Sequence, residues 1–108
     1  MNSARGEVRI TIGGVTNTHC VTMGALARIE GRLDMVLIEV LQQVQRASYR
    51  VALAILEETV IREGDFVEPS DLLGGPKEVA DGCLQIFEAA GLMGKPKAAP
   101  KRAATATA

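Results

Sequence analysis

The hydrophobic pattern of the chain begins with a period of two and then changes to the spacing of helices. Residues 5–12 alternate polar and β-branched side chains, which is typical of a half-buried strand. Gly13-Gly14 follows and supplies the positive φ values of a tight turn. The return strand is expected to be weaker, since residues 16–19 are all polar. We therefore predict a β-hairpin over residues 5–22, and because an isolated hairpin is only marginally stable, its apolar face must lie on helices.

Apolar residues then recur at helical spacing and predict helices over about 23–46, 48–63 and 76–91. The second helix is the candidate for the core, because its first half is apolar on nearly every side. Ser48 is a suitable N-cap for it, and Gly64 is a suitable residue just beyond its end, because glycine tolerates positive φ. The third helix begins at a proline, whose missing N–H would be unpaired in a first turn anyway, and it can cover the second.

The first helical stretch contains an interruption that the pattern leaves open. Thr22 can cap it, Gly31 can end or bend it, and Asp34 is a suitable N-cap for a second helix. The bundle therefore has three or four helices. From residue 33 onward an apolar stripe at three-four spacing is expected to pack inward, and it consists of Leu33, Val36, Leu37, Val40, Leu41 and Val44.

Two pairs of apolar residues are candidates for a partner-binding surface. Met35 and Ile38 lie outside the inward stripe and widen the apolar surface. Leu72 and Leu73 lie on a short turn that Pro69 can start. In so small a domain such residues can form a docking site for a partner. Another helix of the same chain covering Met35 and Ile38 is an equally good explanation.

The composition indicates one folded domain followed by a tail. With 108 residues, of which 47% are hydrophobic, the chain is long enough for a single core. We predict an α+β, mainly α, domain over residues 1–93, in which the hairpin packs on the helices. Residues 94–108 are rich in alanine, lysine and proline and contain no large apolar residue. We predict that they form a flexible basic tail.

Charge is unevenly distributed between these two parts. Residues 1–94 contain all 13 acidic residues and 8 of the 12 basic ones, a net charge of −5, whereas residues 95–108 carry +4. No strong attraction of nucleic acid is expected from the body, so nucleic acid is not the expected partner. The tail is interpreted in one of two ways. It binds an acidic partner or nucleic acid weakly, or it is a terminus that only increases solubility.

The sequence contains no pattern typical of a catalytic, cofactor or metal site. His19 is the only histidine, and Cys20 and Cys83 lack the spacing of a zinc or redox motif. The glycine pairs lack the remaining residues of a phosphate-binding loop. We expect no enzyme activity, no cofactor, no metal and no small-molecule substrate. Without a signal-peptide pattern or an uninterrupted apolar stretch that could span a bilayer, a soluble intracellular protein is expected.

The order of the segments carries a resemblance to a known family. Arg5-Gly6-Glu7-Val8 opens the hairpin, and Thr22-Met23-Gly24-Ala25-Leu26-Ala27-Arg28-Ile29-Glu30 opens the first helix. The run from Ser48 to Leu56 and the turn Asp71-Leu72-Leu73 follow. In these features, over about residues 4–92, the chain resembles the tail assembly chaperone family of gene transfer agents and related tailed phages. The most specific piece is the Thr-x-Gly-Ala-Leu-Ala-x-Ile-Glu run.

The resemblance implies a protein of the bacterial host cytoplasm that binds the tape measure protein and tail tube subunits during tail assembly and is absent from the finished particle. Such a chaperone needs no catalytic group, and it can form a homo-oligomer. Members of the family have also been described as tail tube proteins, so a structural tail protein is the alternative. Tube subunits are rich in sheet, whereas this pattern predicts one hairpin, which favours the chaperone. The residues that we expect to contact partners are Met35, Ile38, Leu72 and Leu73.

Overall fold

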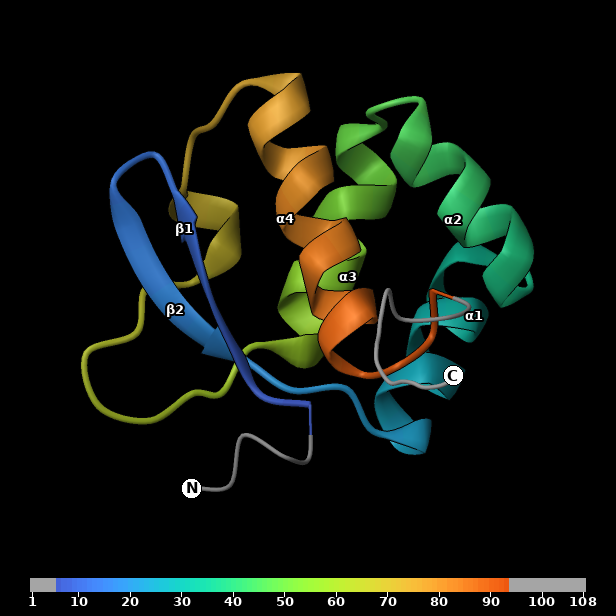
Figure 1. Cartoon of the computed structure of the whole chain (residues 1–108), viewed down its shortest axis with the longest axis horizontal. Helices are drawn as coiled ribbons and strands as arrows, with labels where there is room; N and C mark the ends of the chain where they lie inside the picture. Colours follow the sequence, from blue (N-terminus) through green and yellow to red (C-terminus); the bar gives the residue numbers. More distant parts are fainter. Residues whose placement is uncertain (1–5, 94–108) are drawn as a thin grey trace, which may run out of the picture.

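The structure is a computed structural model that describes residues 6–93. Residues 1–5 and the predicted tail over 94–108 lie outside the described residues. In the described part a two-stranded antiparallel sheet is followed by α-helices (Figure 1). This confirms the predicted α+β, mainly α, fold. The elements are β1 (Val8–Ile12), β2 (Val15–His19), α1 (Met23–Leu33), α2 (Leu37–Gln45), α3 (Tyr49–Thr59), the 3-10 helix η2 (Pro69–Asp71) and α4 (Pro76–Ala89).

The hairpin forms because the alternating strand pattern and the glycine turn agree. β1 and β2 pair from Val8 with His19 up to the turn. Gly13 and Gly14 adopt φ values of 60° and 83°, as the two central residues of a tight hairpin turn require. The predicted turn is therefore confirmed, and the strands occupy the central part of the range predicted for the hairpin.

Helix α3 begins at its predicted cap but ends earlier than predicted. The hydroxyl of Ser48 caps its first turn. The prediction of a helix to residue 63 followed by Gly64 is wrong, because α3 ends at Thr59. The reason is a tertiary contact: Val60 forms a β-bridge with His19, so the chain leaves the helix to extend the sheet. Gly64 does have a positive φ of 68°, but in the loop that follows.

The stretch predicted over 23–46 is two helices, α1 and α2. Gly31 lies inside α1, and the break comes at Asp34, whose φ of 56° lies in the left-handed region. The prediction that Asp34 caps the second helix is wrong, because the N-cap position of α2 is Val36. A free N–H in the first turn of α2 is satisfied from α1 instead: the carboxylate of Glu30 accepts the Leu37 N–H at 2.7 Å.

The inward stripe predicted for this region is only partly confirmed. Val40 and Val44 are buried in the core, and Leu37 and Leu41 are half-buried against it. The inward position predicted for Val36 is wrong, since it is 58% exposed. It precedes the first helical turn, where the helical period does not set the direction of its side chain.

Helix α4 packs against β1, α2 and α3 (Figure 1) and contributes Val79, Cys83, Ile86 and Phe87 to the core. Gly82 permits this packing, because a Cβ there would lie 2.9 Å from Cγ2 of Ile10. Gly91 follows the C-cap of α4 and adopts a positive φ of 78°, which ends the helix. The buried apolar core consists of Ile10, Ile12, Ile29, Leu33, Val40, Val44, Val51, Ala52, Ala54, Ile55, Leu56, Val79, Cys83, Ile86 and Phe87.

Candidate functional site

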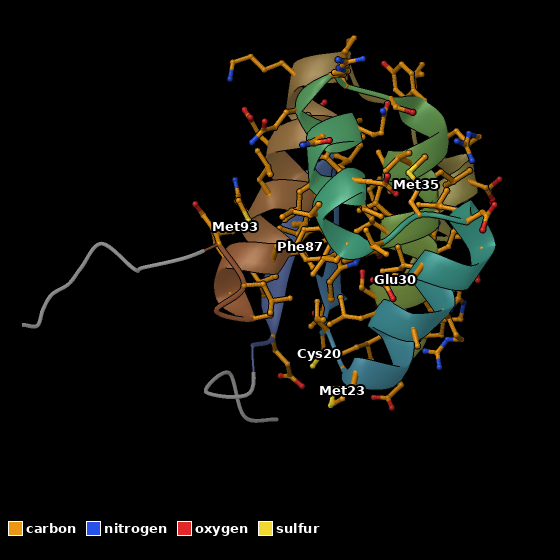
Figure 2. All side chains as sticks on the ribbon, turned by 90° about the vertical axis from the view of Figure 1, so that its right-hand side faces the viewer. Cys20, Met23, Glu30, Met35, Phe87 and Met93 are labelled. Carbon is orange, nitrogen blue, oxygen red and sulfur yellow. The ribbon has the colours of Figure 1, made fainter. Side chains whose placement is uncertain are left out.

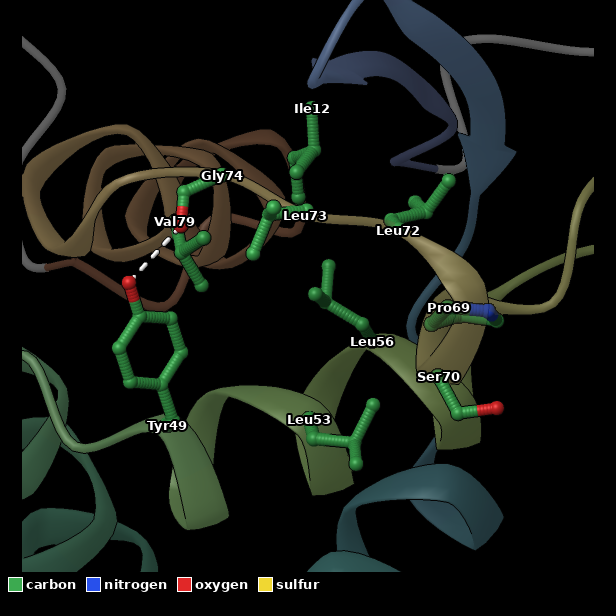
Figure 3. A pocket seen from close by; sticks show the side chains of 10 residues that line it. All are labelled: Ile12, Tyr49, Leu53, Leu56, Pro69, Ser70, Leu72, Leu73, Gly74 and Val79. Atoms are coloured by element: carbon green, nitrogen blue, oxygen red, sulfur yellow. Dashed lines mark hydrogen bonds between the residues drawn. The ribbon is translucent and has the colours of Figure 1, made fainter.

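An apolar pocket of about 160 Å³ opens between α3, η2 and the loop that leads into α4 (Figure 3). We call it the η2 groove. One face of α3 forms its floor, and the end of β1, the start of α4 and the η2 segment form its walls. The residues that line it are Ile12, Tyr49, Leu53, Leu56, Pro69, Ser70, Leu72, Leu73, Gly74 and Val79.

Polar contacts immediately before η2 fix the position of this wall. The side-chain amide of Asn17 on β2 donates to the carbonyl of Val67 at 2.8 Å and accepts the Val67 N–H at 3.0 Å. Arg62 makes two hydrogen bonds, of 2.9 and 3.1 Å, to the carboxylate of Glu68. The bond from Arg62 lowers the pKa of Glu68. Because Pro69 follows directly and begins η2, the hairpin and the segment that follows α3 together fix the position of this wall of the groove.

Tyr49 closes one end of the η2 groove. Its phenol donates a hydrogen bond to the carbonyl of Gly74 at 2.8 Å (Figure 3). Tyr49, Leu53 and Leu56 follow one another at helical spacing, so they share one face of α3. That face is covered by η2 at one end and by the loop before α4 at the other.

Leu72 and Leu73, two of the predicted partner-binding residues, both line the η2 groove. Leu72 is half-buried and packs against the core, whereas Leu73 is 85% exposed. An exposed leucine beside an apolar pocket favours contact with an apolar group, because each Å² of apolar surface removed from water contributes about 25 cal/mol.

The other two predicted residues belong to a second surface at the junction of α1 and α2, which we call the α2 corner. Met35 is half-buried against the core (Figure 2). Ile38 is 68% exposed. A shallow pocket of about 420 Å³ adjoins Met35 and Val36. Two of the carboxylates that line it are engaged with backbone, since Glu30 accepts from the first turn of α2 and Glu39 accepts the Val36 N–H at 3.2 Å.

The structure does not bring the four predicted residues together. Figure 1 shows α2 on one side of α3 and α4, and the segment that contains η2 on the other. Leu72 and Leu73 line the η2 groove. Met35 lines the pocket at the α2 corner, and Ile38 follows it in the first turn of α2. A partner helix that occupied one surface would leave the other accessible.

The buried titratable side chains are engaged inside the domain. His19 is 2% exposed, and its Nδ1 lies 2.9 Å from Oγ1 of Thr59. Because Thr59 donates its single hydroxyl proton to the carbonyl of Ile55 at 2.8 Å, Nδ1 of His19 is the donor in their bond. Burial lowers the pKa of His19 to about 4 and raises the pKa of Cys83 to about 12. Both side chains are therefore neutral near pH 7.

The chemistry of the η2 groove suits binding to an apolar group. Its lining is apolar apart from backbone and the hydroxyls of Tyr49 and Ser70.

Within residues 6–93, no three His, Cys, Asp or Glu side chains form a group that could hold a metal ion. No helix in this part of the chain is long and apolar enough to cross a membrane.

Several lining residues of the groove were not predicted from the sequence. Tyr49 offered a signal, because a tyrosine at the start of an apolar helix combines a large apolar ring with a hydroxyl that needs a partner. Ile12 and Val79 offered none, because they come from β1 and α4 and reach the groove only through the tertiary fold.

Comparison with protein-family models, with curated proteins and with solved structures gives no match for this chain.

Proposed function

We propose that this protein is a tail assembly chaperone of a gene transfer agent or phage, which binds the tape measure protein and tail tube subunits in the bacterial cytoplasm during tail morphogenesis. The role requires no catalytic group, cofactor or metal. The order of the quoted sequence segments supports it, and the η2 groove is the structural observation that carries it.

The η2 groove has the properties that a reversible apolar contact needs. It is open, apolar and adjacent to the exposed Leu73, and its position is fixed by Asn17 and Arg62 before a partner arrives. A pocket that is already formed loses little conformational freedom on binding, so burial of an apolar side chain contributes more to affinity. A helical client presents such side chains at every third or fourth residue, which the groove can accept one at a time.

The α2 corner provides a second contact of the same kind. Ile38 on α2 and Val36 before it are both exposed. Since the corner and the η2 groove lie on different sides of the domain, one molecule can hold two segments of a long client (Figure 1). Two weak contacts on one client raise the overall affinity without making either contact permanent.

A structural tube protein is the alternative function. A ring of tube subunits needs many strands, whereas the sheet within residues 6–93 has two. This difference favours a chaperone. Purification of finished tails distinguishes the two, because a chaperone is absent from them and a tube protein is a major component.

Co-expression with the long helical tape measure protein tests the proposal. The wild-type protein is expected to raise the soluble fraction of the tape measure protein, and Leu73→Ser and Ile38→Ser are each expected to weaken the complex about tenfold, because each removes one exposed apolar contact. These two residues are preferable to Met35 and Leu72, which also pack against the core.

Met23→Ser is the matched control for this experiment. Met23 is 86% exposed and lies at the opposite end of α1 from the α2 corner (Figure 2). This variant measures how much the complex weakens when one exposed apolar side chain is lost outside both the η2 groove and the α2 corner. The proposal fails if the wild-type protein leaves the tape measure protein insoluble, or if all three variants weaken the complex equally.

A further inference from the structure

The two outer edges of the hairpin differ in how their backbone groups are satisfied. In a hairpin with a two-residue turn, Ile12 and Val15 form a hydrogen-bonded pair, and every second pair after it does the same. The residues in between direct their N–H and C=O groups outward. On β1 these are Arg9 and Thr11, and on β2 they include Thr18.

The outer edge of β2 is covered by the chain that leaves α3. The carbonyl of Thr18 accepts the Ile61 N–H at 2.9 Å, and the N–H of Cys20 donates to the Thr59 carbonyl at 2.9 Å. Together with the bridge between His19 and Val60, these bonds let residues 59–61 cover the outer edge of β2.

The outer edge of β1 has no such cover within residues 6–93. No hydrogen bond joins the outward backbone groups of Arg9 or Thr11 to another described residue. Both residues are exposed. An edge of this kind is a template on which another extended chain can pair.

Space for an added strand lies directly beside this edge. A pocket of about 340 Å³ lies between β1 and α4. It is lined on the β1 side by Arg9, Ile10 and Thr11, and on the α4 side by Glu78, Asp81, Gly82 and Gln85. Gly82 brings the strand and the helix together, because it has no side chain to separate them. A chain paired with β1 would therefore lie over the polar face of α4.

That face of α4 carries negative charge. Glu78 and Asp81 line the pocket, Gln85 follows, and Glu88 continues the same stripe at a spacing of three or four residues. Lys77 pairs with Asp81 at 2.9 Å, but the lysine side chain is almost fully exposed, so water screens this ion pair. Every second side chain of an added strand points toward α4, so positive side chains at those positions would be favoured.

We infer that the outer edge of β1 binds an extended segment of a partner protein that carries lysine or arginine at alternate positions. The inference is independent of the function proposed above, because it concerns neither the η2 groove nor the α2 corner. A second copy of this chain is a poorer occupant, since pairing of two β1 strands about a twofold axis would bring Glu78 and Asp81 of both copies together.

A synthetic peptide tests this inference. The probe is a seven-residue peptide that alternates lysine and valine, with both ends blocked, titrated calorimetrically into the full-length protein at low salt. Binding is expected to slow hydrogen exchange of the Arg9 and Thr11 amides, which pair with the peptide, and to weaken as salt is added. A peptide with glutamate in place of lysine is expected not to bind.

A pair of proline variants locates the contact. Thr11→Pro removes an outward N–H of β1 without removing a backbone hydrogen bond to β2. It is expected to weaken peptide binding about tenfold through the lost backbone hydrogen bond to the peptide and the altered edge. Thr16→Pro is the matched control, because Thr16 lies opposite Thr11 on β2 and either change breaks the hydrogen bond between their hydroxyls. It is expected to leave binding unchanged.

Three results would overturn the inference. The first is no calorimetric binding of the lysine peptide to the folded wild-type protein. The second is equal weakening by Thr11→Pro and Thr16→Pro when circular dichroism shows both variants folded. The third is a dimer in sedimentation that Thr11→Pro dissociates, which would identify a second copy as the occupant of the β1 edge.

Discussion

The hairpin and helix α2 are attached to the rest of the domain by different means. The hairpin meets α4 and the loop before it through close steric contact at Gly13, Gly74 and Gly82, where an added Cβ would overlap neighbouring atoms. α2 buries Val40 and Val44 in the core, but its ends are less tightly packed: its start is held by the carboxylate of Glu30, and the turn after it passes through Ala47, whose φ is 60°.

This difference indicates which part of the fold can adjust. A contact made by close packing tolerates little change in shape, because protein interiors are as densely packed as crystals. A helix end that is fixed by a partly exposed polar contact opens at lower free energy than the core, even though Val40 and Val44 anchor the middle of α2. α2 also carries the exposed Ile38, so the α2 corner is the surface on which a partner can be accommodated by a small movement of one helix.

The largest effect is expected at the turn of the hairpin. Gly13→Ala should lower the free energy of unfolding by about 4 kcal/mol, since a Cβ there would overlap the backbone carbonyl oxygen of Leu73 and the residue would also be held at positive φ. Urea unfolding measures the loss.

Gly14→Ala separates the two contributions to this loss. Gly14 also has a positive φ, but nothing lies within 4 Å of a Cβ placed on it. It should lose only about 1 kcal/mol. Equal losses in the two variants would show that the hairpin is not tightly packed at its turn, and the contrast with α2 would fail.

The second prediction concerns His19, which joins β2 to the end of α3. Its pKa is 6.5 in an unfolded chain and about 4 in the folded domain, because burial disfavours the charged ring. Between these values the unfolded chain binds more protons than the folded one. The contribution of His19 to the free energy of unfolding is therefore complete above pH 6.5. About 3 kcal/mol of it is lost as the pH falls toward 4.

Other carboxylates also titrate in this range, so the measurement must isolate His19. Urea unfolding of the wild-type protein at pH 7 and pH 4.5 is compared with that of His19→Gln, which has no titrating ring. The wild-type protein should lose more stability than the variant between the two pH values. Parallel losses would place the imidazole in contact with water.

The hairpin could be predicted from the sequence because its information is local. Alternation over a few residues and two adjacent glycines determine a strand, a turn and a return strand. The end of α3 could not be predicted in the same way. Val60 continues the helical stripe of Tyr49, Leu53 and Leu56, and only its pairing with the distant His19 takes it out of the helix.

The candidate surfaces show the same limit. The sequence identified Leu72, Leu73, Met35 and Ile38 as apolar residues outside the main stripes, and it could not show that α3 and α4 separate the two pairs. The η2 groove depends on Asn17 in β2 holding Val67, a contact between polar groups distant in sequence. Polar contacts of this kind leave no periodic pattern.

The smallest effect is expected at the end of α2. Ala47 occupies a left-handed conformation, which is unfavourable by about 1–2 kcal/mol for a residue with a Cβ. Ala47→Gly removes this strain but increases the conformational freedom of the unfolded chain, so a net stabilisation of about 0.5 kcal/mol is expected.

Ala27→Gly on the exposed face of α1 is the control, because the same substitution inside a helix should destabilise the domain by about 1 kcal/mol. Urea unfolding of both variants beside the wild-type protein provides the comparison. Changes of opposite sign in the free energy of unfolding of the two variants would show that the end of α2 is strained. If Ala47→Gly destabilises as much as Ala27→Gly does, the turn after α2 is as well satisfied as a helix interior, and α2 is not the adjustable part of the fold.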